Sequence, residues 1–168
     1  KSLTRLFDSN NDGAADGRFT YTYDANGKLS TTSDDGNNDG TPEYTVTYTY
    51  DANGRLSEES EDSNGDGDPD SILTITYTDA GNEKLLSRDR DADGDADSLT
   101  SFTYDTNGHT LSQVNDTNAD GNANRIYDFT HNANGQMLTQ RLDDNADLTV
   151  DSIQTFTYDA NGQQLTHM

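Results

Sequence analysis

The stretch Asp62-Ser63-Asn64-Gly65-Asp66-Gly67-Asp68-Pro69-Asp70 decides how this sequence is organised. Its pattern is D-x-N-x-D-G-x-x-D, with oxygen-bearing side chains at positions 1, 3, 5 and 9 and a glycine at position 6. Calcium takes roughly six to eight oxygen ligands, and glycine permits the sharp bend that brings such ligands together. The stretch therefore predicts a calcium-binding loop.

Versions of this loop return every 27 residues along the chain, six times in all. The predicted metal ligands at positions 1, 3, 5 and 9 are Asp8, Asn10, Asp12 and Asp16; Asp35, Asn37, Asp39 and Glu43; Asp62, Asn64, Asp66 and Asp70; Asp89, Asp91, Asp93 and Asp97; Asp116, Asn118, Asp120 and Asn124; Asp143, Asn145, Asp147 and Asp151. Clustered carboxylates repel one another unless a cation lies between them. We therefore expect up to six Ca²⁺ ions. Binding should be weakest in the loop from Asp116, which has Asn at positions 3 and 9, and in the loop from Asp143, where Leu148 replaces glycine.

Segments with alternating side chains lie between the loops. They are residues 19–23, 46–50, 73–77, 102–104, 129–131 and 156–158, with Tyr, Phe or Ile alternating with Thr. Alternation with a period of two is typical of a β-strand, with one face that packs and one that meets solvent. An Asn-Gly pair follows most of these strands, as at Asn26-Gly27 and Asn53-Gly54, and predicts a hairpin turn because both residues tolerate positive φ.

A second strand should follow each turn, with a leucine as its apolar residue. This leucine stands two residues after the glycine at Leu29 and Leu56, but three residues after it at Leu111, Leu138 and Leu165. A shift of one residue would turn the side chain to the other face. We therefore expect a compensating difference in turn length or a β-bulge.

These units predict an all-β protein in which residues 1–168 form one array of about six 27-residue repeats. Each repeat reads as strand, Asn-Gly turn, strand and calcium loop, which gives an antiparallel meander, a coiled sheet or a tube. A β-solenoid with one coil per repeat is the alternative. The absence of an evident capping repeat indicates a window of a longer array.

Composition limits the classes of function. Of the 168 residues, 29% are hydrophobic, there is no Cys or Trp, and 32 acidic against 10 basic residues give a formal charge of −22. Such a charge makes nucleic acid and anionic membranes poor partners and makes cations good ones. No apolar run is long enough for a membrane helix, and no signal peptide is evident. Without disulfides, stability must come from the sheet, aromatic packing and metal.

The segment Tyr48-Thr49-Tyr50-Asp51-Ala52-Asn53-Gly54-Arg55-Leu56 resembles the YD repeat of RHS proteins and teneurins. That resemblance implies hairpins in a long coiling β-sheet, and an RHS-like shell segment as one possible role. The acidic loops resemble the calcium loops of integrin α-chain propellers and thrombospondin type 3 repeats. They depart from EF-hands because position 12 is Phe19, Val46, Leu73, Thr100, Tyr127 or Gln154 rather than Glu.

Other readings of the sequence are weaker. The tyrosine stripe could be a carbohydrate platform, but a stripe at strand period is more often core. The Thr rows are suited to an exposed strand face and could carry O-glycans, and Asn115-Asp116-Thr117 is the one sequon for N-glycosylation. No nucleophile or acid–base pair is arranged for catalysis, so we expect no enzymatic activity.

The sequence thus predicts a calcium-stabilised, extracellular structural repeat protein, such as the shaft of a surface filament or the stalk of an adhesin. Its partners would be further repeats or other copies of itself. Extracellular calcium modules bind at roughly 10⁻⁴ to 10⁻³ M, a concentration available outside cells. A surface module that binds glycans or proteins is the alternative.

Overall fold

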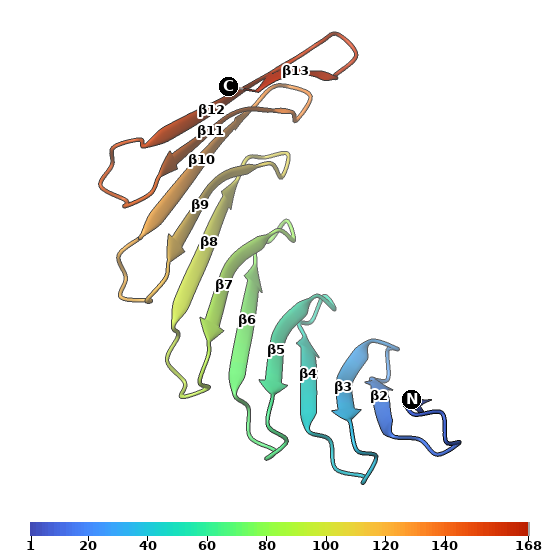
Figure 1. The fold of residues 1–168 in the computed structure, drawn as a ribbon. Coiled ribbons are helices and arrows are strands. Elements are labelled where there is room, and N and C mark those ends of the chain that lie inside the picture. The colour runs from blue at the N-terminus through green and yellow to red at the C-terminus, as the bar shows by residue number, and fades with distance from the viewer. Residues whose placement is uncertain (168) are drawn as a thin grey trace. The chain divides into compact units, whose positions relative to one another are not determined.

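The computed structural model describes residues 1–167, which form thirteen strands. Short connections join consecutive strands (Figure 1). The strands lie in one antiparallel sheet in the order of the sequence, as the 27-residue pattern predicted. They are β1 (Ser2–Phe7), β2 (Gly17–Tyr23), β3 (Leu29–Asp35), β4 (Tyr44–Tyr50), β5 (Leu56–Asp62), β6 (Ser71–Tyr77), β7 (Glu83–Asp89), β8 (Ser98–Tyr104), β9 (Thr110–Asp116), β10 (Arg125–His131), β11 (Met137–Asp143), β12 (Ser152–Tyr158) and β13 (Gln164–His167).

The chain divides into two compact units. One comprises Lys1–Thr74 with Arg88–Asp95, and the other comprises Ile75–Ser87 with the residues from Ala96 onward. In both units the strands are joined alternately by tight turns and by acidic loops, which lie at opposite ends of the strands (Figure 1). No helix that could span a membrane occurs among the described residues.

The threonine rows and the aromatic rows separate as the alternation predicted. In β4, Thr47 and Thr49 are exposed, whereas Tyr48 between them is half-buried and Val46, on the same face as Tyr48, is buried with 5% of its surface accessible. Hydroxyl groups pair across the hairpins, with 2.6 Å between Oγ1 of Thr22 and Oγ1 of Thr31. Threonines in these rows therefore add cross-strand hydrogen bonds to their β-propensity.

Little hydrophobic surface is removed from water in this fold. Val46 and Ile75 are the buried hydrophobic residues of the described chain, and Asp35, Asp89, Asp116 and Asp143 are buried as well. Burial of a Val or Ile side chain contributes only about 1.5–3 kcal/mol. The interior of the sheet is therefore too small to account for its order without its hydrogen bonds and its loops.

The Asn-Gly turns have a geometry that differs in one respect from the prediction. Gly27 has a φ of 82°, but Asn26 does not have a positive φ. Gly27 N donates to Asp24 O at 3.1 Å, and Asp24 N donates to Lys28 O at 2.8 Å. This is a type I turn followed by a left-handed glycine, so only the glycine needs positive φ.

A β-bulge is present in every hairpin that is closed by a tight turn and whose pairing is described. This bulge does not bring the later leucines to the position that Leu29 and Leu56 occupy. The register shifts at the same place in each copy, where Tyr23 pairs with Leu29 and Tyr104 pairs with Thr110. The turn length does not change, because the same hydrogen bonds close each turn. The later leucines lie one residue beyond the pairing position, and Leu111 is 41% exposed.

Candidate metal centres

The six acidic loops share one backbone conformation. Position 6 has positive φ in each of them, from 87° at Gly121 to 101° at Gly40 in the five loops with glycine, and 72° at Leu148. Position 4 also has positive φ, for example 54° at Asn38 and 52° at Ala92. Positive φ at positions 4 and 6 bends the chain so that the side chains at positions 1, 3 and 5 turn toward the inside of the loop. Glycine, asparagine and alanine are therefore common at positions 4 and 6.

The aspartate at position 1 is the centre of each loop. Asp62 Oδ1 accepts a hydrogen bond from Gly65 N at 2.7 Å, and its Oδ2 accepts one from Gly67 N at 3.0 Å. Position 1 accepts the same bond from the amide of position 6 in every loop. The carboxylate therefore holds the loop closed, and this explains why four of the six are buried.

Positions 3, 5 and 9 complete the arrangement. Asn64 Oδ1 accepts from Asp66 N at 2.8 Å, and Asp66 Oδ1 accepts from Asp68 N at 2.9 Å. At position 9, Asp70 Oδ2 accepts from Ser63 N at 2.7 Å and from Ser63 Oγ at 2.6 Å. The serine hydroxyl, and then its amide, lower the pKa of Asp70. The side chains at all four predicted ligand positions are thus held by hydrogen bonds within the loop. Among the described residues, carboxylate oxygens of three such positions lie within 4.8 Å of one another in the loops from Asp35 and Asp89.

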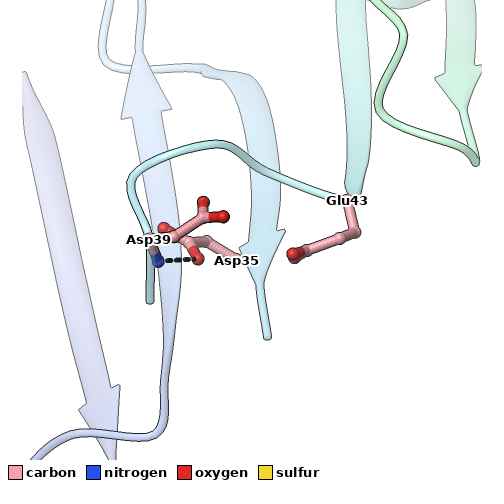
Figure 2. A group of neighbouring side chains, drawn as sticks. All are labelled: Asp35, Asp39 and Glu43. Atoms are coloured by element: carbon pink, nitrogen blue, oxygen red, sulfur yellow. Dashed lines mark hydrogen bonds between the residues drawn. The ribbon is translucent and has the colours of Figure 1, made fainter. Parts of the chain in front are cut away.

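The loop from Asp35 brings three carboxylates together in the view of Figure 2. Oxygen atoms of Asp35, Asp39 and Glu43 lie within 4.8 Å of one another. Asp39 N donates to Asp35 Oδ1 at 3.0 Å, and Gly36 N donates to Glu43 Oε2 at 2.8 Å. Glu43, which is longer than the Asp or Asn at this position in the other loops, reaches the same cluster from the residue just before β4.

The loop from Asp89 contains a carboxylate oxygen that lacks a partner. Asp89 is 8% exposed, and its Oδ1 is buried without a hydrogen bond from any described residue, while Gly94 N donates to Oδ2 at 3.0 Å. Desolvation acts to raise the pKa of Asp89, but amide donors led by Gly94 outweigh it and keep the pKa low. A carboxylate oxygen from Asp91 lies within 4.8 Å, and Asp97 is half-buried just before β8. A buried, charged oxygen of this kind fits a cation.

The two loops expected to bind most weakly keep the common backbone. Asn124 Oδ1 accepts from Thr117 N at 2.6 Å and from Thr117 Oγ1 at 2.8 Å, as the aspartate at position 9 does elsewhere. Leu148 N donates to Asp143 Oδ2 at 2.8 Å even though Leu148 is 89% exposed. The loop from Asp116 differs from the first and third in charge, and both loops differ from them at position 3, where the asparagine amide donates to the aspartate at position 5 instead of the one at position 9. Positive φ at a leucine adds backbone strain in the loop from Asp143.

Arginines that follow two of the loops reach the next loop along the sheet, which the motif alone did not predict. Arg18 Nη2 lies 2.6 Å from Asp35 Oδ2, and Arg125 forms an ion pair with Asp144. Asn38 Nδ2 also donates to Ala15 O at 3.3 Å, which joins the first two loops. An arginine two residues after Asp16 was the sequence feature that could have indicated this ion pair. The register of the sheet decides which loop the arginine reaches.

The turns carry a second set of aspartates that do not gather into a cluster. Asp51 Oδ1 accepts from Asn53 N at 2.9 Å and from Arg55 N at 2.8 Å, and its Oδ2 lies 2.6 Å from Arg55 Nη2. The Arg55 amide and then its guanidinium lower the pKa of Asp51. Thr78 takes the same place in the divergent third turn, where its Oγ1 accepts from Asn82 N at 3.1 Å. The aspartate of the Tyr-Asp pair is therefore a turn cap.

The sequence matches no protein-family model, and no curated protein matches it. Among solved structures, the chain is similar to the crystal structures of TcdB2-TccC3 and of TcdB2-TccC3-TEV, each with 20% sequence identity and a TM-score of 0.68. Each alignment covers 99% of this chain and 8% of the other. The likeness shows the fold, and it agrees with the hairpin architecture that the YD resemblance implied. This chain spans a small part of the length of those proteins.

Proposed function

We propose that this chain is a structural segment of a longer hairpin-repeat sheet, and that Ca²⁺ bound in its acidic loops stabilises it outside cells. Residues from four loop positions would hold each ion through carboxylate and amide oxygens. The ion would supply charge neutralisation and cross-linking of the loop. Its task in this proposal is mechanical.

The buried Oδ1 of Asp89 is the observation that carries the proposal. A buried carboxylate oxygen without a donor is destabilising, and a cation is the partner that would satisfy it. The cluster of Asp35, Asp39 and Glu43 supports the same conclusion in a second loop. Two buried hydrophobic residues contribute too little to order so polar a chain, so metal binding has a clear energetic purpose.

The likeness to TcdB2-TccC3 favours a wall or shaft built by continuation of the same sheet. Sheet edges expose unpaired backbone groups, which further repeats or another copy would cover. A shell segment of this kind and a filament shaft use the same repeat, so calcium stabilisation is compatible with both. Extracellular calcium concentrations suit loops of this type better than cytosolic ones.

The decisive experiment is reversible removal of calcium from the 168-residue chain. We expect EGTA to lower the unfolding temperature and the β-sheet signal in circular dichroism, and added Ca²⁺ to restore both. A site filled at one hundred times its Kd contributes about 2.7 kcal/mol. Mg²⁺ serves as a control for non-specific charge screening. Identical unfolding curves in EGTA and in Ca²⁺ would contradict the proposal.

A second experiment tests the ranking of the loops. Asp66→Ala and Asp120→Ala change the same position in a strongly and a weakly acidic loop. We expect Asp66→Ala to remove more calcium affinity in isothermal titration, because the loop from Asp62 carries four carboxylates within nine residues. A larger loss in Asp120→Ala would show that charge does not set the order.

A further inference from the structure

A row of phenylalanines and glutamines crosses the sheet from β8 to β12, within one of the two compact units. Phe102, Phe129 and Phe156 stand 27 residues apart on alternate strands, and Gln113 and Gln140 stand on the two strands between them. Gln113 pairs with Phe102 across the β8–β9 hairpin, and Gln140 pairs with Phe129 across the β10–β11 hairpin. Phenyl rings therefore alternate with carboxamides on one face, because directly paired residues point to the same side of a sheet.

Among the described residues, no second layer covers this face. Each strand from β8 to β13 contacts only its neighbours in the sheet. The three phenylalanines of the row are half-buried, whereas a stripe of aromatic residues is more often core. The rings therefore keep part of their surface available to a partner.

Two adjoining pockets lie along the row. One, of about 200 Å³, is lined by Phe102, Thr110, Gln113, Phe129, His131 and Met137. The other, of about 310 Å³, is lined by Gln113, Asn115, Tyr127, Phe129 and Gln140. Because the two pockets share Gln113 and Phe129, they form one groove that runs across β8 to β11. Such a groove has the scale of a site for a small ligand or for part of a longer one.

The groove avoids formal charge in a chain whose net charge is −22. No Asp, Glu, Lys or Arg lines either pocket. Gln113 Nε2 donates to Asn115 Oδ1 at 3.0 Å, which orients the carboxamide and leaves its second N–H and its carbonyl oxygen for another partner. A fitting ligand is therefore neutral, both donates and accepts hydrogen bonds, and has apolar C–H groups that can cover aromatic rings. A sugar has all three properties.

A peptide does not fit this face as well. An extended peptide binds a sheet through unpaired backbone groups at an edge strand. Strands β9, β10 and β11 are paired on both sides, so their backbone groups are already used. Side chains alone must recognise the ligand here.

The spacing along the row favours one class of sugar chain. Neighbouring strands lie about 4.8 Å apart, so rings on alternate strands recur at about 10 Å. A disaccharide unit of an extended β-1,4-linked chain has nearly the same length. Each phenyl ring would therefore meet every second sugar, and the carboxamides between the rings would reach hydroxyl groups.

We propose that this groove binds a neutral, extended β-1,4-linked oligosaccharide. Phe102, Phe129 and Phe156 stack on the sugar rings, and Gln113 and Gln140 hydrogen-bond with the hydroxyls. Binding would give the array an adhesive surface in addition to its structural role. The proposal does not rest on the proposed role of Ca²⁺.

Earlier repeats carry other residues in the same row, and these supply matched variants. Ile75 stands two repeats before Phe129, and Leu86 stands one repeat before Gln113. Glu59 stands two repeats before Gln113, in the other compact unit, so the row is charged there. Phe129→Ile and Gln113→Leu therefore introduce residues that the fold already accepts at these positions.

The test is isothermal titration calorimetry of the calcium-saturated 168-residue chain with cellotetraose, mannotetraose and chitotetraose. We expect saturable binding of at least one of these sugars. Maltotetraose, whose α-linkages curve the chain, and tetragalacturonic acid, which is charged, should bind at least roughly tenfold more weakly. Failure of all three β-1,4-linked sugars to bind, or equal affinity for maltotetraose, would overturn the proposal.

The variants locate the site on the row. We expect Phe129→Ile to weaken binding roughly tenfold and Gln113→Leu about fivefold, with circular dichroism unchanged in both. Tyr48→Ile, which removes a ring from the row in the other unit, is the control and should leave the affinity unchanged. Unchanged affinity in Phe129→Ile, or an equal loss in Tyr48→Ile, would contradict the assignment.

A second copy of the chain is the competing occupant of this face. Sedimentation equilibrium of the sugar-free chain distinguishes the two, and we expect any self-association to be the same in wild type and Phe129→Ile. A dimer that Phe129→Ile dissociates would show that another copy covers the row, and would overturn the proposal.

Discussion

The acidic loops and the Asp-Ala-Asn-Gly turns close the two ends of the same hairpins, yet they use aspartate in different ways. Asp51 in a turn meets two amide groups and the Arg55 guanidinium, so its charge is balanced locally. Asp62 in a loop also meets amide groups, but its nine-residue loop contains three other carboxylates. The turns are complete by themselves, whereas the loops carry excess charge that calls for a cation.

The largest effect should come from removing the central carboxylate of a loop. In Ca²⁺ we expect Asp62→Ala to lower the free energy of unfolding by about 3 kcal/mol, because amide donors lose their acceptor and the loop loses a metal ligand. In EGTA the loss should be smaller, since removal of one carboxylate relieves repulsion. Chemical denaturation in both buffers measures the difference.

Asp51→Ala is the matched control for the turn. It should lower the free energy of unfolding by about 1 kcal/mol, equally in Ca²⁺ and EGTA, because its partners are protein groups. Calcium dependence of the same size in both variants would abolish the distinction between loops and turns.

The next effect concerns contact between neighbouring loops. A Cβ on Gly65 would lie 2.5 Å from the carbonyl oxygen of Pro42, whereas a Cβ on Gly67 would meet nothing within 4 Å. Both glycines have positive φ, so each substitution by alanine carries about 1 kcal/mol of backbone strain. We expect Gly65→Ala to lower the free energy of unfolding by about 1 kcal/mol more than Gly67→Ala does, because the backbone at Pro42 must move to admit the new methyl group. Thermal unfolding of both variants measures the difference.

Ala92, Ala119 and Ala146 show that alanine is accepted at the position of Gly65 in other loops. The extra cost in Gly65→Ala is therefore assigned to Pro42 and not to the loop conformation. Equal destabilisation by Gly65→Ala and Gly67→Ala would mean that the two loops do not support each other.

A smaller effect, of opposite sign, is expected in the loop from Asp143. Leu148 has a φ of 72° and is 89% exposed, so it is strained and packs against little. Leu148→Gly should raise the free energy of unfolding by about 0.5–1 kcal/mol in EGTA. Thr149→Gly, a control at the next residue, which is also exposed, should not stabilise the chain, because Thr149 has no positive φ.

The smallest effect should be a pH dependence that arises in a turn. His109, through its ring and then its amide, lowers the pKa of Asp105 to about 2. The charged carboxylate therefore stabilises the fold fully above its unfolded pKa of about 3.9, and this contribution is lost as pH falls toward 2. Wild type should exceed Asp105→Asn in stability at pH 5 in EGTA, and the gap should close near pH 2.

Asp105→Asn is a conservative change, because a neighbouring turn already has asparagine at the equivalent position. There, Asn132 Oδ1 accepts from Asn134 N at 2.9 Å and from Gln136 N at 3.0 Å. A gap between wild type and Asp105→Asn that stays constant from pH 5 to pH 2 would contradict a charge effect and point to geometry alone.

Periodicity in the sequence predicted the strands, the turns and the loops, because each depends on residues close together in the chain. The turn glycine, the alternating Thr and Tyr, and the carboxylates at odd loop positions are all local signals. Local reasoning was less accurate at Asn26, which does not adopt the positive φ expected of it, since a type I turn needs that conformation only at Gly27. The sequence also predicted that a longer turn or a bulge would offset the one-residue shift of the later leucines, although the same hydrogen bonds close the turn in each copy.

The sequence by itself determined the repeat and the positions of the acidic residues in each loop, and it favoured the meander order of the strands that the structure shows, since these follow from spacing over fewer than thirty residues. Only the tertiary structure decided contacts between repeats, such as Arg18 with Asp35 and Gly65 with Pro42. The same is true of the pocket beside His131, which Thr110 of β9 and Met137 of β11 line from the strands on either side of β10. Pairing of one strand with the next sets these contacts, and pairing register is a property of the folded sheet.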